Sequence, residues 1–151
     1  MKEDQHTLKT AYSLCPNYDK IIEIALATGV FSLANSIQLT PGIPLRPMLA
    51  SPTRGIREIM ERFTGQDFTC EWKYDGEHCQ VHRLANGEVK LYSRGMENNT
   101  GKYPDIVKSL PTAVKAGVKE FIADAEVVAW DRDEKCILPF QVLATRKRKV
   151  S

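Results

Sequence analysis

The stretch that decides the fold of this chain is "TCEWKYDGEHCQVH", residues 69–82. Charged and apolar residues alternate along it, which predicts a half-buried strand with Glu71, Lys73 and Asp75 on one face, ended by Gly76. A solvated sheet edge explains such a charged face. A reactive lysine also explains it, because carboxylates can orient a lysine while burial or nearby cations favour its neutral, nucleophilic form. The stretch alone leaves both explanations open.

The sequence after this stretch predicts an antiparallel sheet. "CQVHRLANGEVKLYSR" contains two alternating runs around Asn86-Gly87, the preferred dipeptide of a two-residue type I′ hairpin turn, because both residues tolerate positive φ. The later run "KEFIADAEVVAW" predicts a mostly buried strand that carries Asp124 and Glu126 on one face.

Two helical regions are predicted before the sheet, with a boundary between them. Residues 1–40 are expected to be helical, with Asn17 among the start signals of one helix and Gly29 at its end. "LTPGIPLRPML" follows with three prolines, which remove backbone donors and favour a stiff, extended chain. We therefore expect a boundary there, which divides the chain into residues 1–40 and 41–151.

A one-sided apolar stripe marks the next helix, in "SPTRGIREIMERF". Its start signals are Ser51 or Thr53, either of which is a suitable N-cap. Its stripe has helical spacing and is formed by Ile56, Ile59, Met60 and Phe63. We expect this helix to pack on the sheet, and we expect a further helix to begin at Pro104.

Composition excludes several classes of protein. The chain has 151 residues, of which 42% are hydrophobic and 26% charged, so it can form a core. Its formal net charge of +2 is too small to indicate a polyanion partner by itself. The four cysteines form no C-x-x-C pair, which argues against a zinc ribbon or a disulfide framework. His78 and His82 lie four apart without an H-E-x-x-H pattern, which disfavours a zinc site. No run approaches the ~20 apolar residues of a membrane span, so we expect a soluble intracellular protein without a membrane partner.

Several ordered blocks give the lysine stretch a context. They are "LTPGIPLRPMLASPTRGI", "EWKYDGEH", "LYSRGMENNTGKYPDI", "FIADAEVVAWD" and "PFQVLATRKRK". Together they resemble the ATP-dependent DNA ligases, most closely the eukaryotic replicative type, DNA ligase I, from about residue 10 to residue 150. The mRNA-capping enzymes and RNA ligases share the lysine motif, but the blocks "NNTGKYPDI" and "PFQVLATRKRK" favour a DNA ligase.

The resemblance implies an α+β fold. Residues 41–151 would form the first, incomplete part of a nucleotidyltransferase or adenylation domain, an ATP-grasp-like antiparallel sheet with packing helices. Residues 1–40 would form the short all-α end of the DNA-binding domain. The sequence stops before the family's adenine-stacking motif, its later metal-binding glutamate, its paired lysines and its OB-fold. We therefore expect the remainder of the ligase as a partner, and unpaired strand edges without it.

The resemblance also implies a reaction. Lys73 would attack the α-phosphate of ATP, with Mg²⁺ as cofactor, to form a phosphoramidate with AMP and release pyrophosphate. The AMP would pass to the 5′-phosphate of a nick in duplex DNA, and the 3′-hydroxyl would displace it. The expected setting is DNA replication, repair and recombination in the nucleus.

The resemblance assigns the other site residues by position. Glu71 would accept a hydrogen bond from the adenine amino group, and Asp75 with Gly76 would form the turn that aims the lysine. Arg94 would lie on the ribose and phosphate side, although a simple surface arginine is also common at a strand end. Glu126 would contact the ribose and the metal.

Three positions need separate treatment. His78 stands where the family has an arginine that helps to hold AMP, and a neutral imidazole cannot make the bidentate contact of a guanidinium, so we expect weaker nucleotide binding or adenylation. Gly95 stands where an asparagine usually follows the arginine. Asp124, near Glu126, is either a further residue of the site or a purely structural one, and the sequence leaves this open.

Other residues are assigned to packing, and one basic run stays open. Trp72 and Tyr74 are expected in the core rather than as base-stacking platforms. Core packing is also expected of Phe121, Ile122, Val127 and Val128. "TRKRK", residues 145–149, is a nuclear-import signal, a DNA-phosphate contact or a solvated loop.

Two functions from different classes follow. The first is a ligase fragment that carries the nucleophile and part of the pocket and has little or no activity alone. The second is a truncated, non-catalytic fragment that binds only DNA or a protein partner. Covalent AMP on Lys73 distinguishes them, because only the first function requires it.

Overall fold

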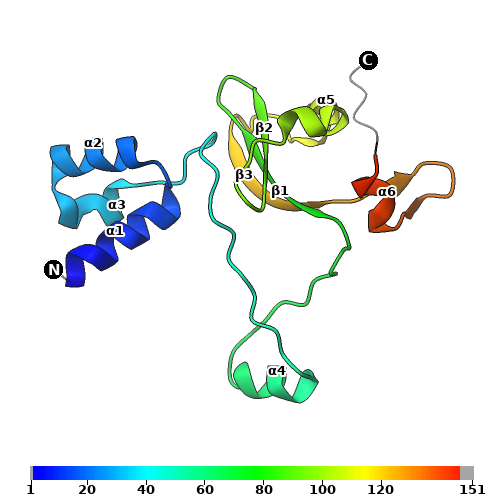
Figure 1. The fold of residues 1–151 in the computed structure, drawn as a ribbon, viewed down its shortest axis with the longest axis horizontal. Coiled ribbons are helices and arrows are strands. Elements are labelled where there is room, and N and C mark those ends of the chain that lie inside the picture. Colours follow the sequence, from blue (N-terminus) through cyan, green and yellow to red (C-terminus); the bar gives the residue numbers. More distant parts are fainter. Residues whose placement is uncertain (1, 147–151) are drawn as a thin grey trace.

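The computed structural model describes residues 2–146 of the chain (Figure 1). Its elements mix helices with small antiparallel sheets, so the fold is α+β. The N-terminal helices are α1 (Lys2–Leu14), α2 (Tyr18–Thr28), η1 (Val30–Ser32) and α3 (Leu33–Ser36), followed by the separate helix α4 (Ile56–Arg62). The main sheet is formed by β1 (Glu77–Arg83), β2 (Val89–Ser93) and β3 (Phe121–Val127), with η2 (Thr100–Lys102) and α5 (Pro104–Ala113) between β2 and β3. The last elements are β4 (Trp130–Asp131), β5 (Cys136–Ile137) and α6 (Phe140–Ala144).

The N-terminal helices form their own small core. Asn17 caps α2, because its Oδ1 accepts a hydrogen bond from the Lys20 backbone N–H at 3.1 Å. Gly29, with φ +84°, ends the same helix, as its sequence predicted. The buried residues of this unit are Ala11, Cys15, Ile21, Leu33 and Ile37. These contacts confirm the predicted helical segment, whereas its assignment to a DNA-binding domain stays a prediction.

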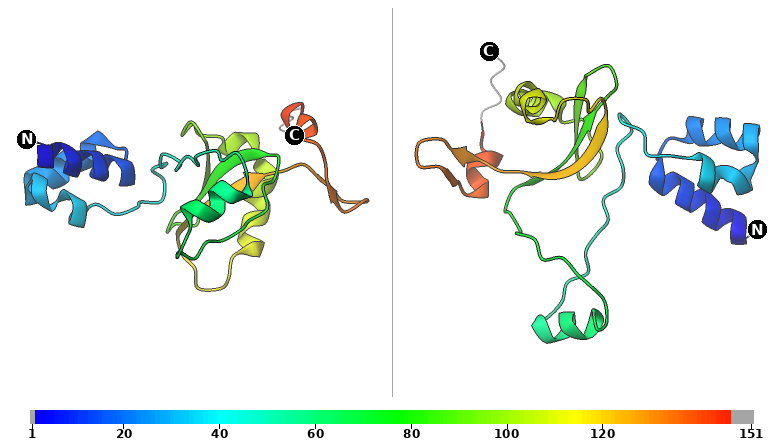
Figure 2. Two further views of the ribbon diagram at one scale, coloured as in Figure 1. Left: turned by 90° about the horizontal axis from the view of Figure 1, so that it is seen from below. Right: turned by 180° about the vertical axis from the view of Figure 1, so that it is seen from behind.

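The main sheet is antiparallel in the order β2-β1-β3, with β1 in the centre. Side chains alternate along β1, so Cys79 and Val81 face one side and Gln80 and His82 face the other. Helix α5 covers the Cys79 side (Figures 1 and 2). The core there consists of Cys79, Val81, Val89, Leu91, Tyr103, Val127 and Leu143, with apolar residues of α5 packed against it.

The residues in and next to β3 that were predicted to pack in the core differ in their burial. Val127 lies in the buried cluster and Phe121 packs against it, whereas Ile122 and Val128 are half-buried. The sequence predicted a mostly buried strand, and this prediction is wrong, because three consecutive residues, Asp124 to Glu126, are exposed. β3 pairs only with β1 among the described residues, so its other edge has no ladder partner there.

The hairpin between β1 and β2 is confirmed, but its turn differs from the prediction. Leu84 N–H donates to Glu88 O at 2.8 Å, and Gly87 N–H donates to Leu84 O at 2.8 Å. Only Gly87 of the Asn-Gly pair has positive φ, at +86°. These bonds describe a three-residue loop that ends in a left-handed glycine, rather than a two-residue type I′ turn.

Three predictions upstream of the sheet are wrong: the strand before Gly76, the N-cap of α4 and the packing of α4 on the sheet. Residues 69–75 are not a strand: β1 begins at Glu77, because no neighbouring strand among the described residues offers a ladder to the preceding segment. Helix α4 is present, but it begins after Gly55 rather than at a Ser51 or Thr53 cap. Figures 1 and 2 show α4 at the tip of a long loop, away from the sheet, and its Ile56 is 78% exposed.

The remaining predictions concern the start of α5, the basic run near the end of the chain, and membrane spans. Pro104 begins α5, as predicted. Most of "TRKRK", residues 147–149, lies outside the described residues. Within the part of the chain that the structure describes, no helix has the length and apolar character needed to cross a membrane.

Candidate functional site

A cleft of about 720 Å³ opens beside the N-terminal end of β1. Five separate segments line it: residues 47–50, residues 72–78, the end of β2 with the turn after it, the exposed part of β3, and Phe140 of α6. The cleft brings together six of the residues that were singled out from the sequence, namely Lys73, Asp75, Gly76, His78, Arg94 and Glu126. Residues from distant parts of the chain therefore share one concave surface.

The seventh residue, Glu71, lines an adjoining hollow of about 520 Å³. This hollow shares His78, Asp124 and Glu126 with the cleft, so the two form a continuous depression. Glu71 thus lines the adjoining hollow and not the main cleft, and Trp72 lines both.

Gly76 marks the point where the chain enters the sheet, and its lack of a side chain is required by close packing. A Cβ at this position would lie 2.2 Å from Val127 O and 2.9 Å from Glu126 Cγ. The end of β3 therefore touches the backbone directly at the base of the cleft. Glycine is needed here for close approach and not for positive φ.

The segment that carries Lys73 is exposed and has no regular structure. Trp72 is 86% exposed and Tyr74 is 48% exposed, so the prediction that these rings belong to the core is wrong. Both rings line the depression instead. They failed to become core residues because the alternation that suggested a buried face does not lie in a sheet.

His78 lies on the cleft face of β1, opposite Glu126 in the β1–β3 register. Its Nε2 is 2.6 Å from Asp124 Oδ1, a pair that is ionic only if the imidazole is protonated. Neither ring nitrogen makes a hydrogen bond within the described residues, so the approach to Asp124 does not follow the N–H direction. Asp124 therefore lies in the site, a position that the sequence alone did not decide.

Arg94 follows β2 in a tight turn that leaves its side chain exposed at the cleft. Ser93 Oγ accepts hydrogen bonds from the backbone N–H groups of Gly95 at 3.2 Å and Glu97 at 3.1 Å. Met96 adopts positive φ, at +66°, to complete the turn. Arg94 and Lys73 therefore line the same cleft although they come from different segments.

Glu77 is a residue of the site that the sequence reasoning missed. Its carboxylate accepts hydrogen bonds from Lys102 Nζ (2.6 Å to Oε1), Tyr103 Oη (2.8 Å) and Asn99 Nδ2 (3.2 Å). Lys102 also contacts Oε2 closely. The only sequence signal is the position of Glu77 directly after Gly76, since its partners come from a loop more than twenty residues away.

Burial around Glu77 also perturbs two neighbouring groups. Desolvation, followed by the charge of Glu77, raises the pKa of the Cys79 thiol to about 11. Burial and the hydrogen bond to Glu77 raise the pKa of the Tyr103 hydroxyl above its usual value. Both groups therefore stay neutral at physiological pH and serve the packing beneath the cleft.

The donor set suits a loosely held divalent cation rather than a caged one. No group of three or more His, Cys, Asp or Glu side chains within residues 2–146 could hold a metal ion alone. Glu126 and Asp124 project from the same face of β3 beside the cleft. Mg²⁺ commonly uses one or two carboxylates together with substrate phosphates and water, and this arrangement fits that pattern.

Comparisons with known proteins agree on one family. A family model described as the ATP dependent DNA ligase domain matches residues 47–151. DNA ligase 1 of Drosophila melanogaster is 55% identical over 142 residues, which cover 94% of this chain and 19% of the relative. DNA ligase 1 of Arabidopsis thaliana is 47% identical over 99% of the chain and 19% of its own length. A DNA ligase of Caldivirga maquilingensis is 42% identical over 94% of the chain and 23% of its own length. The chain thus spans about a fifth of the length of the curated relatives it matches.

Proposed function

The chain belongs to the family of ATP-dependent DNA ligases, and we propose that it carries the residues of the first ligation step, the transfer of AMP from ATP to Lys73. One observation supports this proposal most strongly. The cleft brings a lysine, an arginine and two carboxylates together from three segments, and its volume of about 720 Å³ lies in the range of small-molecule sites. We further propose a nucleotidyltransferase fold, related to ATP-grasp sheets, for residues 41–151.

In this proposal the bond changes are simple. Lys73 Nζ, in its neutral form, forms a bond to the α-phosphorus of ATP, and the bond from that phosphorus to the pyrophosphate oxygen breaks. The nitrogen then gives up a proton to solvent. Arg94, which also lines the cleft, would neutralise phosphate charge, and Glu71 in the adjoining hollow would contact the adenine.

Glu126 would hold Mg²⁺ at the end of β3, with Asp124 beside it. The ion, when bound, supplies charge neutralisation at the phosphates. Asp75 and Gly76 have a positioning role in the proposal: the tight contact between Gly76 and Val127 O fixes where the Lys73 segment leaves the sheet.

His78 makes the site weaker than one with arginine at this position. Its ring faces Asp124 at 2.6 Å, and an imidazole cannot form the two parallel hydrogen bonds that a guanidinium offers to a phosphate. We therefore expect low nucleotide affinity. His78→Arg would raise it.

The later steps are proposed for the whole ligase. AMP on the lysine would pass to the 5′-phosphate of nicked duplex DNA, and the 3′-hydroxyl would close the nick, in nuclear DNA replication, repair and recombination. The N-terminal helices would contribute to DNA binding, and the remainder of the ligase would be a partner of this segment. A basic sequence run at 145–149 is consistent with nuclear import.

Intact mass spectrometry after incubation with ATP and Mg²⁺ tests the first step. The expected result is a mass increase of one AMP on a small fraction of the chain, in keeping with weak activity, that disappears in Lys73→Ala and persists in Lys108→Ala, a matched exposed lysine on α5. Circular dichroism establishes that each sample is folded. No adduct on the folded wild-type chain would overturn adenylation by this segment alone.

The alternative function is a fragment that binds DNA without catalysis. It predicts binding of a nicked duplex oligonucleotide, measured by fluorescence anisotropy, that is equal for wild type and Lys73→Ala and requires no ATP. Binding of this kind together with the absence of an adduct would favour the alternative.

A further inference from the structure

One face of the sheet holds both the cleft and the segment that leads into it. Because side chains alternate, His78, Gln80 and His82 share a face of β1, and the register places Glu126 and Tyr92 on that face too. The segment after the N-terminal helices crosses this face, next to His82 at Gly42 and next to Gln80 at Leu45. It then reaches the cleft, which Pro47, Met48, Leu49 and Ala50 line.

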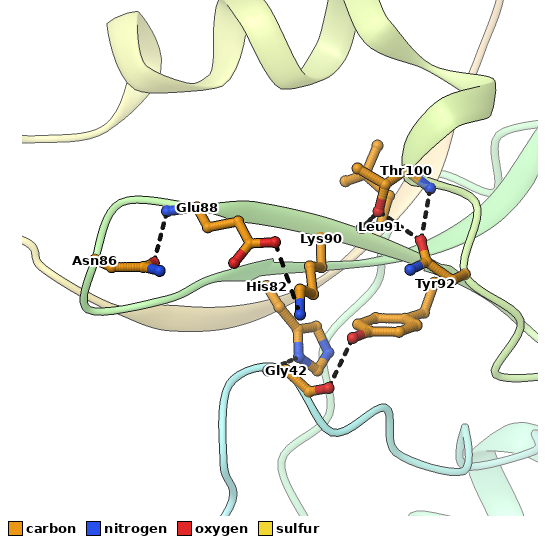
Figure 3. A network of polar contacts seen from close by, with 9 residues as sticks. Gly42, His82, Asn86, Glu88, Lys90, Leu91, Tyr92 and Thr100 are labelled. Atoms are coloured by element: carbon orange, nitrogen blue, oxygen red, sulfur yellow. Dashed lines mark hydrogen bonds and ion pairs between the residues drawn. The ribbon is translucent and has the colours of Figure 1, made fainter.

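Gly42 is held from two strands at once (Figure 3). Its N–H donates to His82 Nδ1 at 2.9 Å, and its carbonyl accepts from Tyr92 Oη at 2.7 Å. The rings of His82 and Tyr92 also contact each other edge to face, with centroids 4.8 Å apart. Gly42 has φ +98°, and a Cβ there would lie 3.7 Å from Leu84, so backbone conformation more than space favours glycine.

The side-chain amide of Gln80 makes hydrogen bonds to both backbone groups of Leu45, as a neighbouring strand would. Gln80 Oε1 accepts from the Leu45 N–H at 2.9 Å, and Gln80 Nε2 donates to the Leu45 carbonyl at 2.7 Å. Gln80 is only 5% exposed, which strengthens both bonds by excluding water. The amide therefore bonds both backbone groups of Leu45, and its Oε1 also lies 3.4 Å from His82 Nε2, which links the two side chains that hold the crossing segment.

After this point the segment has few attachments. Within residues 2–146, the next hydrogen bond along the chain is that of the Arg54 N–H, and the intervening residues that line the cleft are mostly exposed. Met48 is 99% exposed and Leu49 is 70% exposed. The chain just before this cleft wall is consequently held by the hydrogen bonds at Gly42 and Leu45 and by the Arg46 guanidinium, which lies 5.5 Å from the centroid of the Tyr12 ring.

We propose that Gln80 and His82 are positioning residues that lay residues 42–45 along β1 and so place residues 47–50 as a wall of the nucleotide cleft. They touch no reacting atom. The hydrogen bonds restrict the conformations of residues 47–50 before the nucleotide binds. Pre-ordering of this kind raises the affinity because less conformational entropy is lost on binding. This inference rests on the proposed function, since it takes the ligand of the cleft to be ATP.

The test measures ATP affinity by the fluorescence of Trp72, which lines the cleft. The background is Trp130→Phe, which leaves Trp72 as the single tryptophan of a chain that has two. Gln80→Met keeps the volume but removes both bonds to Leu45, and we expect the Kd for ATP to rise about fivefold, the scale of a lost hydrogen bond. Gln66→Met, at an exposed glutamine, is the matched control and should leave the Kd unchanged.

His82 provides a rescue comparison that a merely structural role would not reproduce. His82→Phe removes the acceptor for the Gly42 N–H and should also raise the Kd severalfold. His82→Asn keeps an acceptor oxygen near the Nδ1 position and should restore most of the affinity. If Gln80→Met does not fold, Pro47→Gly supplies a second variant, because it frees the wall from the anchored residues without touching the sheet.

The outcomes separate the two proposals. A higher Kd for ATP in Gln80→Met and His82→Phe, together with a Kd close to that of the wild type in His82→Asn, supports the inference. Equal Kd values for folded wild type and Gln80→Met overturn the inference and leave the proposed function standing. No binding of ATP by the wild-type chain overturns both.

Discussion

Residues 69–75 and residues 77–83 have similar alternating sequences but different structures. The second segment is β1, hydrogen-bonded to a strand on each side, with four of its seven residues buried. The first has no regular structure, and every one of its residues is exposed. Gly76 separates them.

The difference shows that alternation is a necessary but insufficient condition for a strand. Backbone N–H and C=O groups need ladder partners, and β2 and β3 supply these only to the residues after Gly76. The exposed segment instead carries Lys73 on a chain free to meet a ligand. Four experiments test this contrast, in order of expected effect on stability.

The largest effect is expected at the boundary. Gly76→Ala would force a Cβ against the Val127 carbonyl, at 2.2 Å, so the end of β3 must shift. We expect a loss of about 3 kcal/mol in the free energy of unfolding, as for an overpacked site. Urea unfolding followed by circular dichroism measures it. Gly101→Ala is the control, because a Cβ there meets nothing within 4 Å and should change stability by no more than about 0.5 kcal/mol. Equal effects of the two variants would contradict the close contact.

A smaller loss is expected from the ion pair beneath the start of β1. Lys102→Met removes the cation from Glu77, and both side chains are about three-quarters buried, at 24% and 25% exposed. An uncompensated carboxylate in this position should cost about 2 kcal/mol in unfolding free energy. Lys108→Met, on the exposed side of α5, should cost almost nothing. Adding Glu77→Gln to Lys102→Met should recover part of the loss, and failure to recover it would contradict the assignment.

The next effect depends on pH and concerns the far end of β1. Burial lowers the pKa of His82 below its ordinary value of 6.5, and its Nδ1 accepts the Gly42 N–H. The charged groups nearby are Lys90 opposite it on β2 and Glu88 paired with Lys90; Tyr92 and Gln80 are neutral, and its β3 neighbour Ile122 is apolar.

Because the folded state disfavours the proton, this stabilisation is complete above pH 6.5 and is lost as pH falls from 6.5 toward the lowered pKa. Urea unfolding at about pH 7.5 and about pH 5 should show a smaller loss of stability in His82→Asn than in the wild type. The same pH dependence in both proteins would contradict the role of His82.

The smallest effect is expected in the exposed segment. Trp72→Ala and Lys73→Ala should each change the free energy of unfolding by no more than about 0.5 kcal/mol, because neither side chain is packed. Lys73→Ala should nonetheless abolish the AMP adduct. A loss above about 1 kcal/mol in urea unfolding of Trp72→Ala would show that this segment packs on the fold.

Local signals predicted the features that depend on neighbouring residues. The Asn17 cap, the Gly29 helix end, the start of α5 at Pro104 and the existence of the β1–β2 hairpin all follow from short-range backbone chemistry. The turn type was wrong, because the choice between a two-residue and a three-residue loop depends on the pairing of the flanking strands.

Features that depend on distant partners were not predictable in the same way. The apolar stripe of α4 indicated a buried helix, but Ile56 and Met60 remain exposed because no described element lies against them. Glu77 was overlooked because its partners Lys102 and Tyr103 come from a later loop. The six cleft residues were chosen by resemblance to a family, and only the fold shows that they share one space.

The sequence by itself determined the family, the α+β character and the candidate nucleophile Lys73, because motif spacing and local backbone preferences are written along the chain. Only the tertiary structure decided that Gly76 is a contact point, that the alternation before it is not a strand, and that Gln80 and His82 hold the segment leading to the cleft. The physical reason is that steric contact, ladder hydrogen bonds and burial are properties of pairs of groups, and the second member of each pair lies far away in the sequence.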